Sequence, residues 1–271
     1  MTSSSASSER SEPLIDSTVP HSARIWNYWL GGKDNYAVDR AAGDQFRAMF
    51  PGVTEMARAE REFIRRTVRY LAGEAGIRQF LDIGTGLPTV DNTHEVAQRV
   101  ASESRIVYVD NDPLVLAHAR ALLTSTPEGA TDYIDADLRD PAAILAGAER
   151  TLDFTRPIAL MLIGILGHIG NDEEPYGIVG TLLGALPPGS YLAQSDGTDI
   201  DPGLNAATAI YNDTGAVPYH LRSPEEIAHF FDGLDLVEPG VVSTPLWRPD
   251  PGSSLPRGEM AHHGGVGQKS R

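Results

Sequence analysis

Two kinds of hydrophobic run alternate along the chain, and their alternation predicts the fold class. Short apolar runs of the length of buried strands occur five times, at residues 79–83, 105–110, 131–134, 158–163 and 191–195. The segments between them carry the longer spacing of helices, at residues 90–100, 113–123, 141–148 and 172–186. Strands that alternate with helices are typical of an α/β protein with a parallel sheet. The run 158–163 is the most apolar, so we expect it at the centre of the sheet, beside 79–83.

Three further helices are predicted before the sheet begins, at 22–30, 37–50 and 54–72. Ser22 is expected to cap the first of them, and Gly31-Gly32 to end it. Residues 1–20 are rich in Ser with little to bury, which predicts a disordered tail. The chain is therefore expected to divide into a tail at 1–20, a helical extension at 21–75 and a sheet-containing domain at 76–271.

The strand predicted at 79–83 leads directly into Gly84-Thr85-Gly86, and a helical pattern begins near Pro88. Proline is favoured at the first position of a helix. Glycines let the backbone approach a ligand, and the first amides of a helix carry partial positive charge. These features predict a nucleotide-binding turn, although a tight turn without a ligand would have the same residues. Asp82 stands out as a polar residue inside the apolar run.

Acidic residues follow the next two predicted strands. Asp110 ends the strand 105–110, where a carboxylate can accept hydrogen bonds from both hydroxyls of a ribose. The alternative is that Asp110 only helps to cap the helix that opens at Pro113. Asp137 follows the strand 131–134. Because polar residues at the carboxyl ends of parallel strands line the crevice where such sheets bind ligands, we expect a nucleotide-like ligand there.

The composition narrows the class of protein. A chain of 271 residues suits one α/β domain with additions, and it contains no cysteine for a disulfide, a thiolate metal site or a nucleophile. With 37 acids and 22 bases the formal net charge is −15, which argues against binding to nucleic acid. Five arginines of the helix 54–72 interleave with glutamates, which favours a solvated, salt-bridged face. The longest apolar run, 157–169, is too short to span a bilayer and no secretory signal is recognisable, so a cytoplasmic enzyme is expected.

Three blocks of sequence resemble a known family. ARIWNYWLGGKDNY at 23–36, FLDIGTGLPTVDNTHEVAQ at 80–98 and VYVDNDPLVLAHARALL at 107–123 resemble the actinobacterial S-adenosyl methyltransferases, once called domain of unknown function 574, among the class I S-adenosylmethionine-dependent methyltransferases. The resemblance implies a Rossmann-like fold with a seven-stranded, mostly parallel sheet, helices on both faces and an N-terminal helical lid. It also implies S-adenosyl-L-methionine as the cofactor and a terminal antiparallel hairpin formed by 234–237 and 261–268.

Residues from all three blocks and from the later strand ends are expected at the cofactor site. Asp82 is expected near the methionine end of the cofactor, and Asp137 at the adenine amine. The polar, aromatic loop after the first helix is interpreted as part of a lid over the cofactor. The complete set of expected cofactor-binding residues is Arg24, Tyr28, Asn35, Tyr36, Asp82, Gly84, Thr85, Gly86, Asp110, Asn111, Asp137, Leu138 and Gly164.

The expected activity is transfer of a methyl group from S-adenosylmethionine to a small molecule, with no metal site. The sulfonium already activates the methyl group, so the protein has mainly to align donor and acceptor. His168 follows the central strand and could be a general base, although a structural histidine is an alternative.

Two other functions stay open. One is a non-catalytic protein that binds S-adenosylmethionine or S-adenosylhomocysteine. The other is a nicotinamide-dependent oxidoreductase, against which counts the missing third glycine of the dinucleotide fingerprint, since Thr89 stands in its place.

Overall fold

The computed structural model describes residues 15–122, 124–253, 255 and 258–270. Within these residues a sheet runs in the order β3-β2-β1-β4-β5-β8-β6, and β7 pairs with β8. The strands β1 to β5 are parallel, and β8 is antiparallel to its neighbours. The strands are β1 (Gln79–Ile83), β2 (Arg105–Asp110), β3 (Ala130–Asp135), β4 (Ala159–Ile163), β5 (Tyr191–Gly197), β6 (Leu234–Leu236), β7 (Val242–Ser243) and β8 (His262–Lys269).

The central strands of the parallel part are rich in buried apolar residues, as expected of strands that are covered on both faces. All five residues of β4 are buried, and β4 lies between β1 and β5. The predicted central position of this strand, beside the strand of the glycine turn, is therefore confirmed. The predicted seven-stranded, mostly parallel sheet is also observed, with the two-residue β7 as an addition that is too short to leave a pattern in the sequence.

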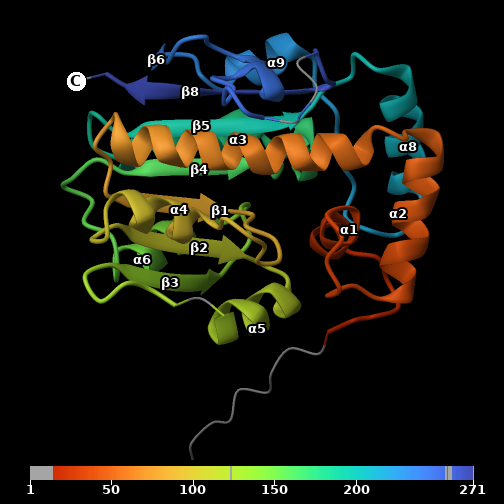
Figure 1. Ribbon diagram of the computed structural model, residues 1–271, viewed down its shortest axis with the longest axis horizontal. Helices are drawn as coiled ribbons and strands as arrows, with labels where there is room; N and C mark the ends of the chain where they lie inside the picture. The colour runs from red at the N-terminus through yellow and green to blue at the C-terminus, as the bar shows by residue number, and fades with distance from the viewer. Residues whose placement is uncertain (1–14, 123, 254, 256–257, 271) are drawn as a thin grey trace, which may run out of the picture.

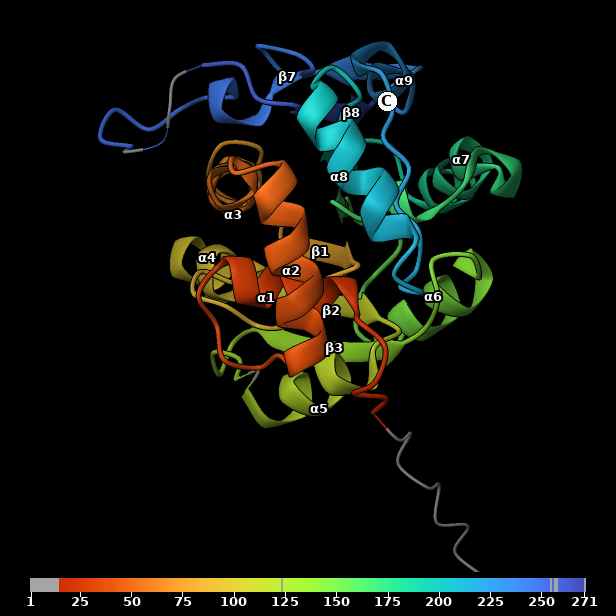
Figure 2. The same cartoon turned by 90° about the vertical axis from the view of Figure 1, so that its right-hand side faces the viewer.

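Helices cover both faces of the sheet (Figures 1 and 2). On one face Phe63 of α3 packs with Phe80 and Met161, and on the other face Ile144 of α6 packs with Leu81 and Leu160. The two cores separate because successive side chains of a strand point to opposite faces. The helices are α1 (Ser22–Trp29), α2 (Ala37–Met49), α3 (Val53–Gly73), α4 (Thr93–Val100), α5 (Pro113–Leu122), α6 (Pro141–Ala148), α7 (Pro175–Ala185), α8 (Pro202–Asn212) and α9 (Pro224–His229).

Helices α1, α2 and α8 lie across the edge at which the parallel strands end (Figure 2). A separate apolar cluster holds them together, with Ile25 and Trp29 of α1, Phe46 of α2 and Leu204 of α8 among its members. Segments from the N-terminal extension and from the region after β5 therefore enclose the edge where α/β sheets bind ligands. Most of the predicted tail, residues 1–14, lies outside the described residues.

Several predicted helix boundaries are wrong, and one of these corrections changes the interpretation of the glycine turn. Helix α4 begins at Thr93 rather than near Pro88, because Asn92 and Glu95 form a capping box. The glycine turn therefore continues into a loop, and a helix terminus does not follow it directly. The residue that caps α1 is His21 and not Ser22. Helix α7 begins at Pro175, since Glu174 has a left-handed conformation with φ of 55°.

Candidate functional site

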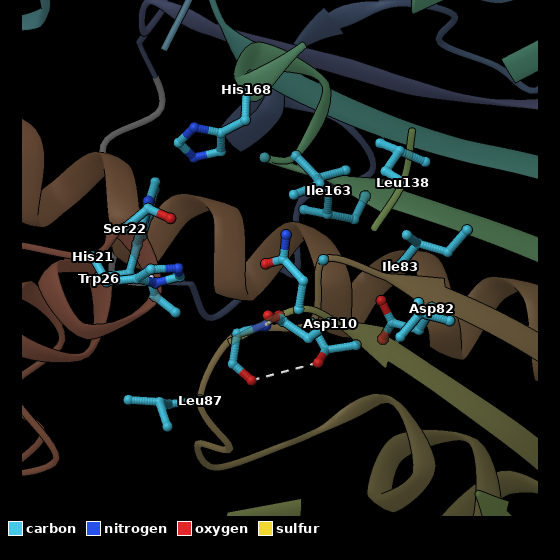
Figure 3. Close-up of a pocket in the computed structure, with 18 of the residues that line it drawn as sticks. His21, Ser22, Trp26, Asp82, Ile83, Leu87, Asp110, Leu138, Ile163 and His168 are labelled. Atoms are coloured by element: carbon cyan, nitrogen blue, oxygen red, sulfur yellow. Dashed lines mark hydrogen bonds between the residues drawn. The ribbon is translucent and has the colours of Figure 1, made fainter. Parts of the chain in front are cut away.

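A cavity of about 190 Å³ lies at the carboxyl ends of β1, β2 and β4. Figure 3 shows Asp82 and Asp110 on the side of the sheet, and His21, Ser22 and Trp26 facing them from the N-terminal segment. The walls therefore come from the loops of the sheet, from α1 and from the amino-terminal half of α3.

The glycine turn has a backbone that other residues would not adopt. Gly84 has φ of +76°, and a Cβ atom there would lie 2.5 Å from the side chain of Ile165. The amide of Gly86 donates a hydrogen bond of 2.8 Å to Oδ2 of Asp110, and the amide of Asp112 donates one of 3.0 Å to Oδ1. Burial raises the pKa of Asp110, whereas these two amides oppose the rise. Asp110 thus anchors the turn and also lines the cavity.

Two carboxylates and a guanidinium line one end of the cavity. These groups belong to Asp82, Glu60 and Arg61. Asp82 accepts a hydrogen bond of 2.6 Å from Thr93 Oγ1, and removal from bulk water raises the pKa of Asp82 to about 6. Arg61 donates to the carbonyl oxygens of Val90 and Asp91, each at 3.2 Å. A cation and two acids so arranged suit a ligand that carries both a carboxylate and an ammonium group.

The carboxylate of Glu60 lies against a histidine of the last strand, β8. Oε2 of Glu60 lies 2.8 Å from Nε2 of His262, whose side chain is 1% exposed. The other carboxylate oxygen lies against Gly164, where an added Cβ would be 3.1 Å from Oε1. With φ of +69° Gly164 also has a conformation that favours glycine. The loop after β4 therefore leaves room for this carboxylate.

His168 has a defined tautomer. Its Nδ1 lies 3.0 Å from the carbonyl oxygen of Pro218, and because a carbonyl only accepts, Nδ1 carries the hydrogen. Nε2 then holds a lone pair. Burial lowers the pKa of His168 to about 4, so the ring is neutral at pH 7. The residue lines the cavity, and its ring packs edge-on against Tyr219 at 5.0 Å between centroids.

Residues 8–270 match the model of the S-adenosyl methyltransferase family. The chain belongs to this family. As a family member it is an S-adenosylmethionine-dependent methyltransferase, and S-adenosyl-L-methionine is its cofactor. The resemblance found in the three sequence blocks is thereby confirmed.

Solved structures agree with this assignment. The methyltransferase is 46% identical to a protein of the same family from Streptomyces avermitilis, with a TM-score of 0.91 over 94% of this chain and 100% of that one. It is 45% identical to a candidate methyltransferase from Thermobifida fusca, with a TM-score of 0.86 over 93% and 96% of the chains. The plantazolicin methyltransferase BamL is 13% identical, with a TM-score of 0.50 over 92% and 96%, and this likeness concerns the fold alone. No curated protein sequence matches the chain.

The residues expected at the site from the sheet and its loops come together around the cavity. They are Asp82, Gly84, Thr85, Gly86, Asp110, Asn111, Asp137, Leu138, Gly164 and His168. Their contact with the cofactor stays a prediction. The residues that follow β2 and β3 are in direct contact, since Asn111 Nδ2 donates a hydrogen bond of 3.1 Å to Asp137 Oδ2.

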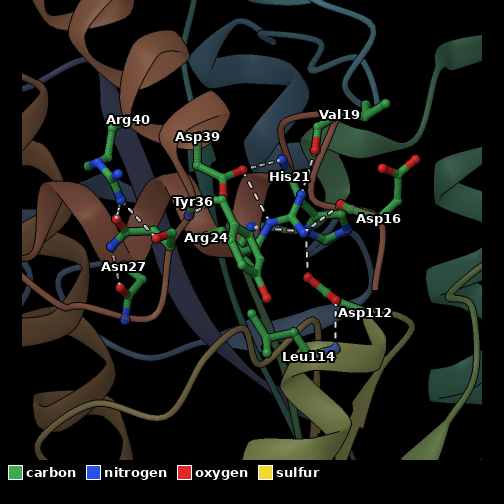
Figure 4. Close-up of polar contacts among 12 residues, drawn as sticks. Asp16, Val19, His21, Arg24, Asn27, Tyr36, Asp39, Arg40, Asp112 and Leu114 are labelled. Carbon is green, nitrogen blue, oxygen red and sulfur yellow. Dashed lines mark hydrogen bonds and ion pairs between the residues drawn. The ribbon is translucent and has the colours of Figure 1, made fainter. Parts of the chain in front are cut away.

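The four residues expected from the N-terminal block do not line the cavity. Arg24 is buried, pairs with Asp39 at 3.1 Å and donates to the carbonyl of Asp16 at 2.9 Å (Figure 4). The ring of Tyr36 lies 5.3 Å from the Arg24 guanidinium carbon. Tyr28 donates to Asp44 at 2.7 Å, and Asn35 Nδ2 donates to Asn27 Oδ1 at 2.9 Å. These contacts connect α1 to α2 and to the loop between them, and so hold in place the helix that does line the cavity.

Glu60, Arg61 and Trp26 line the methyltransferase cavity although the sequence did not predict it. The interpretation of the α3 arginines as a solvated face is wrong for Arg61 and also for Arg66, which is 2% exposed and donates to two backbone carbonyls near Trp247. The sequence pattern does indicate that Glu60 is buried. It lies four residues after Met56 and three before Phe63, on the buried side of the helix.

Two other features bear on the class of site. Among the described residues no group of three or more His, Asp or Glu side chains is arranged to hold a metal ion. In the same part of the chain, no helix combines the length and the apolar character needed to cross a bilayer.

Proposed function

We propose that this methyltransferase acts on a small molecule, with the cofactor between Asp110 and Arg61 and with His168 as the proton acceptor. The observation that carries the proposal is one continuous cavity. It joins the turn anchored by Asp110, the charged groups on α3 and His168. Its cover of helices suits a compound that can be enclosed, rather than a polymer.

The nucleoside end of the cofactor fits the part of the cavity at β2. Asp110 has its two carboxylate oxygens each bound to a single backbone amide, so lone pairs remain for the hydroxyls of a ribose. Asp137 and Leu138 follow β3 and would contact the adenine, with Leu87 as an apolar neighbour. A carboxylate oxygen of Asp137 would accept from the exocyclic amine.

The amino-acid end of the cofactor fits the groups from α3. Arg61 would bind the carboxylate, and Asp82 and Glu60 would face the ammonium. The cofactor supplies a methyl group on a positively charged sulfur, which makes the methyl carbon reactive without further activation.

His168 would remove the proton of the acceptor. Its Nδ1–H bond to Pro218 fixes the ring, and the lone pair at Nε2 can take a proton from a hydroxyl. Edge-on packing against Tyr219 further restricts the ring. Helix α1, which belongs to the predicted N-terminal lid, would exclude water.

The test follows a labelled methyl group. The protein is incubated with methyl-labelled S-adenosylmethionine and a metabolite extract freed of protein and nucleic acid. Label is expected in small molecules, and His168→Ala should lower the rate about 10²–10⁴-fold while cofactor affinity is retained. The exposed His229 provides the matched control, His229→Ala, which should behave as wild type. Cofactor binding without any transfer would favour the non-catalytic alternative, and label on nucleic acid would contradict a small acceptor.

A further inference from the structure

A second cavity of about 50 Å³ adjoins the first one. Its volume is several times the roughly 10–15 Å³ that one water molecule needs but about a third of the roughly 150 Å³ of a cavity that holds benzene, so an aromatic occupant would extend into the first cavity. Ser22, Trp26 and His168 line both cavities, so the second one begins where the proposed proton acceptor lies.

Aromatic rings form one wall of the second cavity. Trp26 packs edge-on against Trp29 with 5.6 Å between centroids, Trp29 lies 5.0 Å from Phe46, and Phe46 lies 6.5 Å from Tyr211. Aliphatic side chains complete the lining, from Ile25, Met56, Leu204 and Leu221. Such a lining favours an occupant with a flat apolar body, which can pack against ring faces and edges.

The lining contains no charged partner for an ionic occupant. Among the described residues around this cavity there is no Asp, Glu, Lys or Arg. A carboxylate or an ammonium group would therefore lose its hydration without compensation. Phosphorylated, acidic and cationic compounds are disfavoured for this reason.

Most polar side chains of the lining already have partners. The hydroxyl of Tyr219 donates to Asp196 at 2.9 Å and accepts from the Gly197 amide at 3.0 Å. The hydroxyl of Tyr211 donates to the carbonyl of Val217 at 3.2 Å. Nε2 of His262 faces Glu60. By contrast, Nε2 of His168 keeps its lone pair, so it can accept a hydrogen bond from an O–H group of an occupant.

We propose that the second cavity takes the apolar end of the methyl acceptor, and that the acceptor is an uncharged aromatic compound with a phenolic hydroxyl. This inference rests on the proposed function. The ring would lie against Trp29, Phe46 and Tyr211, and the hydroxyl would donate to His168 Nε2 at the junction with the cofactor cavity. A phenol is favoured over an aliphatic alcohol because its proton is much more acidic, and burial leaves His168 a weak base.

Small probes of one size and different charge test the chemistry. 4-Methylphenol, benzoate and benzylammonium are titrated into the protein saturated with S-adenosylhomocysteine, and binding is measured by saturation-transfer NMR and calorimetry. 4-Methylphenol should bind at least about tenfold more tightly than either ion, and mass spectrometry with S-adenosylmethionine should detect its methyl ether.

Two variants locate the binding. Thr208 lines the second cavity and not the first, so Thr208→Phe should fill it and weaken 4-methylphenol at least about tenfold with unchanged S-adenosylhomocysteine affinity. Thr181→Phe, on the exposed side of α7, is the matched control. Leu204→Ala enlarges the cavity and should increase the preference for 2-naphthol over 4-methylphenol.

Each failure has a separate meaning. If the protein binds S-adenosylhomocysteine but binds benzoate as tightly as 4-methylphenol, or if neither cavity variant changes phenol binding, the acceptor assignment is overturned and the cofactor site stands. If S-adenosylhomocysteine itself does not bind the wild-type protein, the proposed function fails and this inference fails with it. Should Thr208→Phe lose S-adenosylhomocysteine affinity as a sign of misfolding, the naphthol preference of Leu204→Ala decides.

Discussion

Oε2 of Glu60 lies 2.8 Å from Nε2 of His262, and this contact joins the first long helix to the last strand between the two cavities. Glu60 lines the first cavity and His262 the second. The side chain of His262 is 1% exposed and that of Glu60 10% exposed, so the contact between them is largely shielded from bulk water. The position of Glu60 in the cofactor cavity therefore depends on a residue near the other end of the chain.

His262→Ala should lower the free energy of unfolding by about 3 kcal/mol, because it leaves a buried carboxylate without its partner and opens a space in the core. Urea denaturation measures this. His229→Ala removes a histidine from an exposed pair with Asp232 and should change stability by less than about 1 kcal/mol. Equal effects of the two substitutions would show that the Glu60–His262 contact is not stabilising.

Arg61→Met should weaken S-adenosylmethionine binding about 10–100-fold, because a charge-assisted contact to the cofactor carboxylate is lost. The affinity for 5′-methylthioadenosine, which has no amino-acid end, should be unchanged. Arg58→Met is the control, since Arg58 is an exposed residue of the same helix. Calorimetry that finds both ligands weakened equally would place Arg61 away from the amino-acid end.

Asp196 should make the protein less stable as the pH rises. Burial raises the pKa of Asp196 to about 6, so the native state retains a proton that the unfolded chain releases near pH 4. Unfolding is thus favoured by higher pH between these values, and the effect levels off above pH 6. Relative to Asp196→Asn, the wild type should lose about 1 kcal/mol of stability between pH 5 and pH 7, measured by urea denaturation at each pH. A constant difference across this range would mean that Asp196 does not titrate there.

Trp26→Ala should weaken cofactor binding about tenfold, because Trp26 contributes apolar surface to the lining of the first cavity. Tyr28 lies on the same helix but contacts Asp44 instead of the cavity, so Tyr28→Ala should leave the affinity unchanged. Calorimetry measures the cofactor affinity of both variants. The result distinguishes the lining seen in the structure from the expectation, based on the sequence, that Tyr28 binds the cofactor. A larger effect of Tyr28→Ala would favour that expectation.

The sequence predicted the sheet well because its parallel strands contain short runs of buried apolar residues. Asp82, Asp110 and Asp137 were recognised for the same reason, since a polar residue at the end of such a strand is conspicuous. The start of α4 was missed because Pro88 looked like a helix opening, whereas Asn92 and Glu95 supply the actual cap.

The part of the site that α1 and α3 contribute could not be predicted in the same way. Arginines and glutamates on α3 have the pattern of an exposed helix, and only the tertiary structure turns Glu60 and Arg61 toward the sheet. The contact of Glu60 with His262 joins residues far apart in the sequence, which local patterns cannot reveal. Arg24 was expected at the ligand together with the polar, aromatic loop after its helix, whereas in the structure it pairs with Asp39 and with the carbonyl of Asp16.

Calorimetric titration of S-adenosylmethionine into the wild-type protein and into Asp110→Ala tests the cofactor site most directly. Asp110 both anchors the glycine turn and faces the cavity, so its loss should reduce affinity about 10–100-fold, equivalent to roughly 1.5–3 kcal/mol. Asp235→Ala, at an exposed position of β6, should bind as tightly as wild type. Unchanged affinity in Asp110→Ala would contradict the placement of the cofactor at the end of β2.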